Sequence, residues 1–75
     1  KVILFGFAPG QELSEHTSAR RALLYFVDGD AEVRLGEETF AAKAGSFAYM
    51  PPHLPHSVTA RAETRMLLIM VEAGT

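Results

Sequence analysis

The feature that most constrains this chain is how often its apolar runs are interrupted. Turn signals rich in glycine or proline recur at short intervals: Pro9-Gly10, Asp28-Gly29-Asp30, Gly36-Glu37-Glu38, Ala44-Gly45-Ser46 and Pro51-Pro52 with Pro55. No convincing helical stretch lies between them. Many short strands at near-regular spacing are typical of sandwiches and barrels. The sequence therefore predicts an all-β domain.

Eight segments between these turns are rich in β-branched, aromatic and aliphatic residues. The predicted strands are Val2–Ala8, Glu12–Thr17, Ala22–Val27, Ala31–Leu35, Thr39–Lys43, Phe47–Met50, His56–Ala62 and Arg65–Glu72. In Ala31–Leu35 the apolar residues occupy every second position, as in a half-buried strand. Leu23–Val27 and Met66–Val71 are apolar on both faces. We expect these two strands to be central, or to be covered on the outside by something such as a second subunit.

Two of the turns predict how strands are connected. Asp28-Gly29-Asp30 predicts a tight hairpin, because glycine tolerates the positive φ that such turns need. Gly36-Glu37 is a second, weaker signal of the same kind. We therefore expect a meander of three neighbouring strands over residues 22–43.

The length of the chain limits its stability. A chain of 75 residues forms one domain (residues 1–75) and buries only about 60% of its unfolded surface. It has no cysteine, so neither disulfides nor thiolate-bound metals can add stability. A hydrophobic fraction of 48% favours a dense core, and oligomerisation is a second route to stability. The start at Lys1-Val2, without methionine, indicates that some terminal residues of a longer protein are missing.

Charge and hydropathy argue against two classes of partner. The net charge is −2, the pI is about 5.9, and the only basic cluster is Arg20-Arg21. A nucleic-acid surface needs a much denser basic patch. The longest apolar runs, such as Met66–Val71, are too short to span a bilayer. We expect no nucleic-acid partner, no membrane partner and, from the lack of cysteine and of a signal peptide, a cytoplasmic location.

The side chains best suited to bind a ligand or a metal are three histidines. A single histidine in a small domain is usually a surface residue or a hydrogen-bonded one. His53 and His56, however, share the segment Met50–His56, in which prolines fix φ and stiffen the approach to the next strand. His16 lies near the end of another predicted strand. These positions suit side chains aimed into a pocket, but they do not show that His16 and His56 meet.

Two spaced motifs resemble those of the cupin family. The first cupin motif contains a glycine, two histidines, a glutamate and a closing glycine, and the run Gly10–Gly29 is similar to it. The second contains a glycine, a proline and a final histidine, and the run Gly45–His56 is similar to it. The chain thus resembles a small single-domain cupin of the RmlC-like, cupin-2 type. This resemblance implies an antiparallel jelly-roll barrel, or double-stranded β-helix, with a pocket centred on His16 and His56.

The resemblance to metal-binding cupins is weaker. Those proteins hold a divalent ion with three histidines and a glutamate. By spacing, His16 takes the first histidine position and His56 the last, whereas the second histidine position falls on Ser18 and the glutamate position on Ala22. Two imidazoles alone fall short of the three protein ligands typical of catalytic zinc or non-haem iron sites.

Two residues could complete a metal site. His53 stands where the second motif usually has glycine, so an inward loop would give a site of His16, His53 and His56 for Zn, Fe, Mn or Ni. The alternative is that His53 caps the barrel mouth in solvent. Glu12 shares the face of His16 by strand alternation and could add a carboxylate.

The remaining pocket candidates are amphipathic. Tyr25 and Tyr49 combine an apolar ring with a hydroxyl that could orient a ligand, and the methionines, Met50, Met66 and Met70, could line an apolar cavity. The predicted ligand pocket comprises His16, Ser18, Tyr25, Tyr49 and His56.

Three functions are compatible with the sequence. The leading one is a small stand-alone domain that binds a small molecule and is non-catalytic or of unassigned activity. The second is a metal-dependent oxygenase or isomerase that uses the three histidines. The third is a structural module that forms a homodimer.

Overall fold

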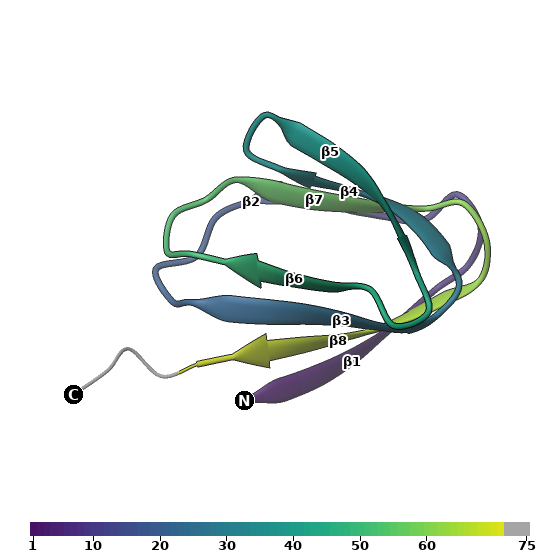
Figure 1. Ribbon diagram of the computed structural model, residues 1–75, viewed down its shortest axis with the longest axis horizontal. Coiled ribbons are helices and arrows are strands. Elements are labelled where there is room, and N and C mark those ends of the chain that lie inside the picture. The colour runs from purple at the N-terminus through teal and green to yellow at the C-terminus, as the bar shows by residue number, and fades with distance from the viewer. Residues whose placement is uncertain (72–75) are drawn as a thin grey trace.

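Eight strands arranged in two four-stranded antiparallel sheets make up the computed structural model, which describes residues 1–71, with His16 described by its backbone alone (Figure 1). The strands are β1 (Val2–Phe7), β2 (Glu12–His16), β3 (Ala22–Asp28), β4 (Asp30–Leu35), β5 (Glu38–Lys43), β6 (Phe47–Met50), β7 (His56–Ala60) and β8 (Thr64–Met70). The first sheet has the order β1-β8-β3-β6 and the second β2-β7-β4-β5.

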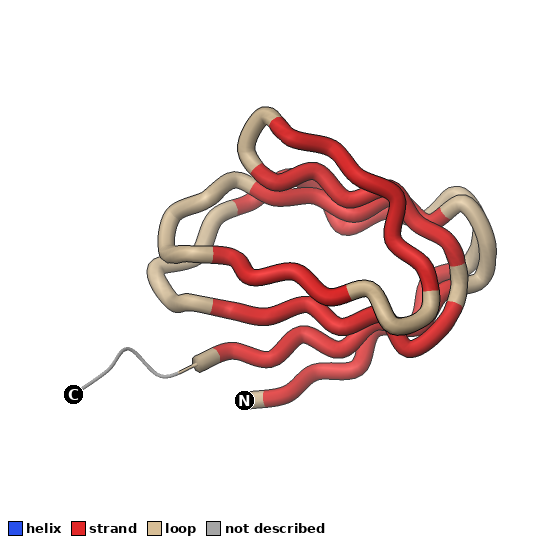
Figure 2. Tube along the Cα trace, in the orientation of Figure 1, coloured by secondary structure: helices blue, strands red, loops and turns tan. Residues whose placement is uncertain are grey.

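The two sheets face each other as the walls of a flattened barrel (Figure 2). Between residues 1 and 71 there is no helix, and hence none that could cross a membrane. The all-β jelly-roll prediction is confirmed, and the ends of the eight predicted strands agree with the observed ones to within about two residues. The predicted end of the last strand at Glu72 lies outside the described residues.

The core lies between the two sheets. Its largest fully buried side chains come from strands of both sheets: Leu24, Phe26, Val33, Val58, Thr64 and Met66. In β3 the buried side chains alternate with more exposed ones, as expected when one face of a strand points inward. Burial of each large apolar side chain contributes roughly 1.5–3 kcal/mol.

The turn at Gly29 differs from the prediction. Only Gly29 separates β3 from β4, yet the neighbours of β3 are β8 and β6, whereas those of β4 are β7 and β5. The tight hairpin predicted at Asp28-Gly29-Asp30 is therefore wrong, and the chain passes at this corner from one sheet to the other. The predicted hairpin at Gly36-Glu37 is confirmed, since β4 and β5 pair along their whole length. Turn residues determine local φ and ψ, but not whether the flanking strands pair.

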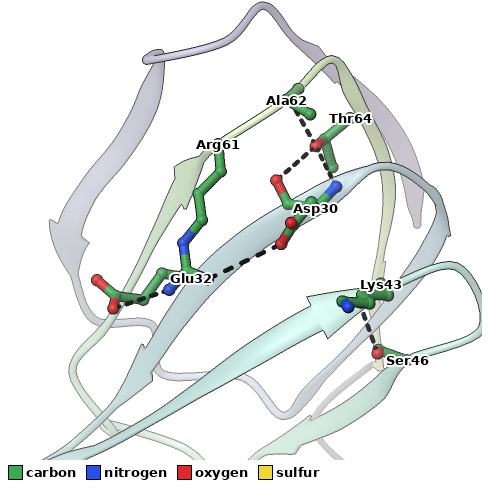
Figure 3. Close-up of polar contacts among 7 residues, drawn as sticks. All are labelled: Asp30, Glu32, Lys43, Ser46, Arg61, Ala62 and Thr64. Carbon is green, nitrogen blue, oxygen red and sulfur yellow. Dashed lines mark hydrogen bonds and ion pairs between the residues drawn. The ribbon is translucent and has the colours of Figure 1, made fainter.

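Hydrogen bonds of Thr64 stabilise the turn at Gly29. Its hydroxyl accepts the Asp30 backbone N–H at 3.1 Å and donates to the Ala62 carbonyl oxygen at 2.9 Å, as Figure 3 shows. Arg61 adds a contact from Nη2 to the Glu32 carboxylate at 3.1 Å (Figure 3). Gly29 has φ +103°, and a Cβ at this position would lie 2.5 Å from Thr64 Cα.

The opposite end of the barrel is built from three loops, residues 17–21, 36–37 and 51–55 (Figure 1). The His53 backbone N–H donates to the Ser18 carbonyl oxygen at 2.7 Å, and the Gly36 N–H donates to that of Pro55 at 2.8 Å. The long proline loop is thus tied to both of its neighbours.

We predict that Gly29→Ala destabilises the protein far more than Gly45→Ala. Both glycines have positive φ, so both variants carry backbone strain of about 1–2 kcal/mol. Only at Gly29 does the added Cβ also collide with backbone atoms, whereas at Gly45 nothing lies within 4 Å. Urea unfolding should show a loss of about 1–2 kcal/mol for Gly45→Ala and at least about 3 kcal/mol, or no folded protein, for Gly29→Ala. Equal losses would contradict the proposed role of the corner.

Candidate functional site

A cavity of about 320 Å³ lies between the sheets at the end closed by the loops at residues 17–21 and 51–55. Its lining comes from both sheets and from the β2–β3 loop: Thr17, Ser18, Ala22, Met50, His56, Leu68 and Met70. Within the described part of the chain, no charged side chain belongs to this lining, which combines two hydroxyls and one imidazole with apolar groups. The cavity is thus mostly apolar with a few polar groups.

His56 is the best-defined polar group of the cavity. It begins β7, its exposed fraction is 5%, and its Nδ1 lies 3.0 Å from the Leu54 carbonyl oxygen. Because a carbonyl can only accept, Nδ1 must carry the proton in this hydrogen bond. In the neutral ring, Nε2 is then the acceptor nitrogen. The turn before β7 therefore sets both the orientation and the tautomer of His56.

The small side chain of Ala22 leaves space in the apolar part of the cavity. It is the Cα partner of Met50 on one side and of Met70 on the other, so its methyl group lies between two long thioether side chains. Ala22 and Met50 are both buried. A larger side chain at position 22 would occupy space that the cavity now offers, while methionines adapt readily to different contents.

The predicted pocket residues separate into two groups. Ser18 and His56 both line the cavity. The backbone of His16 pairs with that of His56 across β2 and β7, but the side chain of His16 lies outside the described residues. Its part in the pocket stays a prediction.

Tyr25 and Tyr49 lie on the outer face of the first sheet. Their exposed fractions are 39% and 50%, and the inward positions of β3 are taken by Ala22, Leu24 and Phe26. The prediction that these two tyrosines line the pocket is therefore wrong. Both faces of β3 are apolar, so the pattern could not distinguish the inner from the outer one.

The described structure gives no support to Glu12 or His53 as a further metal ligand. Glu12 is exposed and pairs with Thr59, whereas its neighbour Leu13 pairs with the buried Val58. The register shifts between Leu13 and His16, so simple alternation does not carry over from Glu12 to His16. His53 is exposed in the β6–β7 turn and does not line the cavity, which removes support from its role as third ligand.

Sequence reasoning missed part of the lining and misjudged one methionine. Thr17 and Leu68 gave no signal beyond their place next to predicted strands. Met50 and Met70 line the cavity as anticipated, whereas Met66 is fully buried in the core.

The cupin spacing brings the right positions together with the wrong residues for a metal. Ser18 and Ala22, at the second histidine and glutamate positions, line one cavity with His56. A methyl group offers no donor, and a neutral hydroxyl is a poor substitute for imidazole. Among the described side chains, no group of three or more histidines and carboxylates could hold a metal ion. The described donor set, which leaves out the side chain of His16, therefore does not fit a divalent metal.

A second hollow of about 400 Å³ lies near the other end of the barrel, lined by Gly6, Phe7, Ala8, Asp28, Glu63, Thr64 and Arg65. It is larger, but its main polar groups satisfy each other. The Arg65 guanidinium donates to the Asp28 carboxylate and holds the pKa of that carboxyl below its usual value. We therefore assign the candidate site to the cavity around His56.

Comparison with known proteins agrees with the resemblance to cupins seen in the sequence. A family model described as a cupin domain matches residues 3–72, and no curated protein matches the chain. A conserved protein of unknown function from Streptococcus pyogenes is 30% identical, with a TM-score of 0.92 over 99% of this chain and 65% of that one.

More distant solved structures share the fold. A cupin superfamily protein from Desulfitobacterium hafniense is 23% identical, with a TM-score of 0.89 over 93% of this chain and 64% of that one. A salicylate 1,2-dioxygenase from Pseudoaminobacter salicylatoxidans is 16% identical, with a TM-score of 0.88 over 92% of this chain and 20% of that one. The chain thus spans less than two thirds of the length of each of these structures.

We predict that metal binding can be installed by two substitutions. Ser18→His together with Ala22→Glu would place the missing ligand types at two lining positions beside His56. Elemental analysis after refolding with Mn²⁺ or Zn²⁺ and dialysis should find about one equivalent in this variant, since three or more protein ligands then converge. The unchanged protein should retain far less than one equivalent.

A matched control carries the same residue types on the outer face of the second sheet, as Thr39→His with Ala41→Glu. It should bind no more metal than the unchanged chain. Stoichiometric metal in the unchanged protein after gentle purification would contradict the assignment, as would a folded Ser18→His/Ala22→Glu variant that binds none.

Proposed function

Because the chain belongs to the cupin family, we propose that it binds a small, uncharged, partly apolar molecule in the cavity between its sheets, with His56 and Ser18 as polar anchors. The composition of the lining carries this proposal. Small-molecule sites are typically apolar hollows with a few well-placed polar groups. The cavity around His56 has this composition.

Size and charge narrow the ligand class. A cavity of about 320 Å³ is at the small end of the range of roughly 300–1,000 Å³ that ligand pockets span. The residues described as lining it include no lysine, arginine, aspartate or glutamate that could pair with a charged ligand. Burying an unpaired charge is costly, so the cavity favours a neutral molecule.

The polar groups favour a ligand that donates a hydrogen bond. Because Nδ1 of His56 donates to Leu54, a ligand that replaces or joins the other contact of this side chain would meet Nε2 as an acceptor. The Ser18 hydroxyl accepts the Arg20 backbone N–H at 3.1 Å, which orients it and leaves its own proton available for donation. An O–H or N–H group on an otherwise apolar body would suit these anchors.

The metal-dependent oxygenase or isomerase reading has less support. It required His16, His53 and His56 around one ion, and His53 is exposed. The likeness to a salicylate dioxygenase, at 16% identity, concerns the fold alone. We propose binding and assign no reaction to the chain.

We propose that the chain works as a homodimer, without a nucleic-acid or membrane partner. The cytoplasmic location stays a prediction from the sequence.

We predict that three probes of similar shape bind in a fixed order. Phenol should bind best, because it combines an apolar ring with a hydroxyl donor for His56. Toluene should bind more weakly and benzoate, which is charged, most weakly. Methyl NMR titrations should show shifts at Met50, Leu68 and Met70. If neither phenol nor toluene shifts these methyl groups at millimolar concentration, the proposed function is wrong.

A variant at His56 tests the hydrogen bond to the ligand separately from the volume of the cavity. His56→Phe keeps most of the volume but removes the acceptor, so phenol should lose roughly 2- to 10-fold in affinity, as expected for one hydrogen bond. Toluene affinity should change little. A similar loss for both probes would show that the substitution altered the cavity instead of removing a polar anchor.

A further inference from the structure

On the first sheet, the wall of the cavity is a row of one short side chain between two long ones. Ala22 of β3 has Met50 of β6 and Met70 of β8 as its Cα partners, and all three residues line the cavity. These three strands lie side by side in the sheet (Figure 1). Two strand spacings of about 4.8 Å place the methionine backbones roughly 10 Å apart, with Ala22 midway between them. Side chains stand roughly perpendicular to a sheet, so the two thioethers border a gap above the Ala22 methyl group.

The gap is confined to this row. The next inward side chain of β3 is that of Leu24, which has Leu68 and Ala48 as Cα partners, and after it comes Phe26. Leu24 and Phe26 are fully buried and fill the space between the sheets. Of the three buried residues of β3, Ala22 is thus the one with a short side chain, and the gap ends at Leu24.

The width of the gap matches an aromatic ring. A thioether sulfur makes favourable contacts with the edge of such a ring at a distance of about 5 Å, because the edge carries a partial positive charge. A ring centred above Ala22 lies about 5 Å from the line of either methionine, which is half of the roughly 10 Å between them. It can therefore contact both sulfurs at once. A saturated ring of similar size has no such edge and gains packing contacts alone.

We propose that Met50, Ala22 and Met70 form a slot for one aromatic ring, and that the molecule bound in the cavity is an aromatic compound. This inference rests on the proposed function and narrows its ligand class. The volume allows it, since a cavity of roughly 150 Å³ is enough for benzene and this cavity has about 320 Å³. Room remains for a hydroxyl group and a further small substituent.

The polar anchors fit the same arrangement. Ala22 lies on the first sheet and His56 begins β7 of the second sheet, and both residues line the cavity. A ring above Ala22 thus contacts one wall, while an O–H group on that ring is directed to the imidazole on the other wall. The slot selects the ring, and His56 selects its substituent. Simple phenols are the ligand class that satisfies both.

Two alcohols that differ in their ring test the slot. Phenol and cyclohexanol each carry one hydroxyl on a six-membered ring, and titrations followed at the Leu68 methyl groups give the affinity of both. Met50→Leu and Met70→Leu keep the apolar volume but remove one sulfur, so each should lower the preference for phenol over cyclohexanol by about 2- to 10-fold. Met66→Leu, the matched control in the core, should leave this preference unchanged.

The position of the ring gives a second test, on the unchanged protein. Phenol should show nuclear Overhauser effects from its ring protons to the ε-methyl groups of both Met50 and Met70 and to the methyl group of Ala22. Effects to one methionine alone would overturn the slot. A preference that Met50→Leu and Met70→Leu both leave unchanged would also overturn it, while the binding of phenol would leave the proposed function standing. If neither alcohol binds, both proposals are wrong.

Discussion

Gly29 and Thr64 lie so close together that no side chain fits between them, and the arrangement of the two sheets depends on this contact. A single residue carries the chain from β3 in one sheet to β4 in the other. The Thr64 hydroxyl binds the backbone of Asp30 on the far side of the turn. Backbone atoms are thereby tightly packed around Gly29, and the mostly apolar cavity that contains His56 lies towards the opposite end of the barrel.

The elements of the fold were predictable because they follow from local chemistry. Frequent turn signals bounded the strands, and alternation in β4 identified its buried face. The two motif-like runs placed Ser18, Ala22 and His56 around one cavity, since spacing along strands of a barrel fixes which positions converge. The prolines before His56 indicated a stiff loop, and hydrogen bonds from both neighbouring loops hold it.

The predictions that failed have another cause in common. Each of them depended on which strands become neighbours. The Gly29 turn looked like a hairpin, as turn chemistry is the same whether the next strand joins the same sheet or the opposite one. Tyr25 and Tyr49 were placed inside because both faces of their strands are apolar. The alternation on which the placement of Glu12 rested is interrupted by a shift of register that no single strand reveals. Local sequence determines a strand, whereas pairing decides its faces.

The same alternation links the cavity to the outer face. Along β8, Leu68 and Met70 line the cavity, whereas Leu67 and Ile69 alternate with them and lie on the outer face of the first sheet. A contact that holds Leu67 and Ile69 from outside therefore also fixes the wall of the cavity from inside, because one backbone carries both. In a small barrel with a marginal core, order in the binding site depends on what covers the sheet behind it. A ligand in the cavity and any contact on the outer side of β8 are thus expected to stabilise each other, even though no residue of β8 takes part in both.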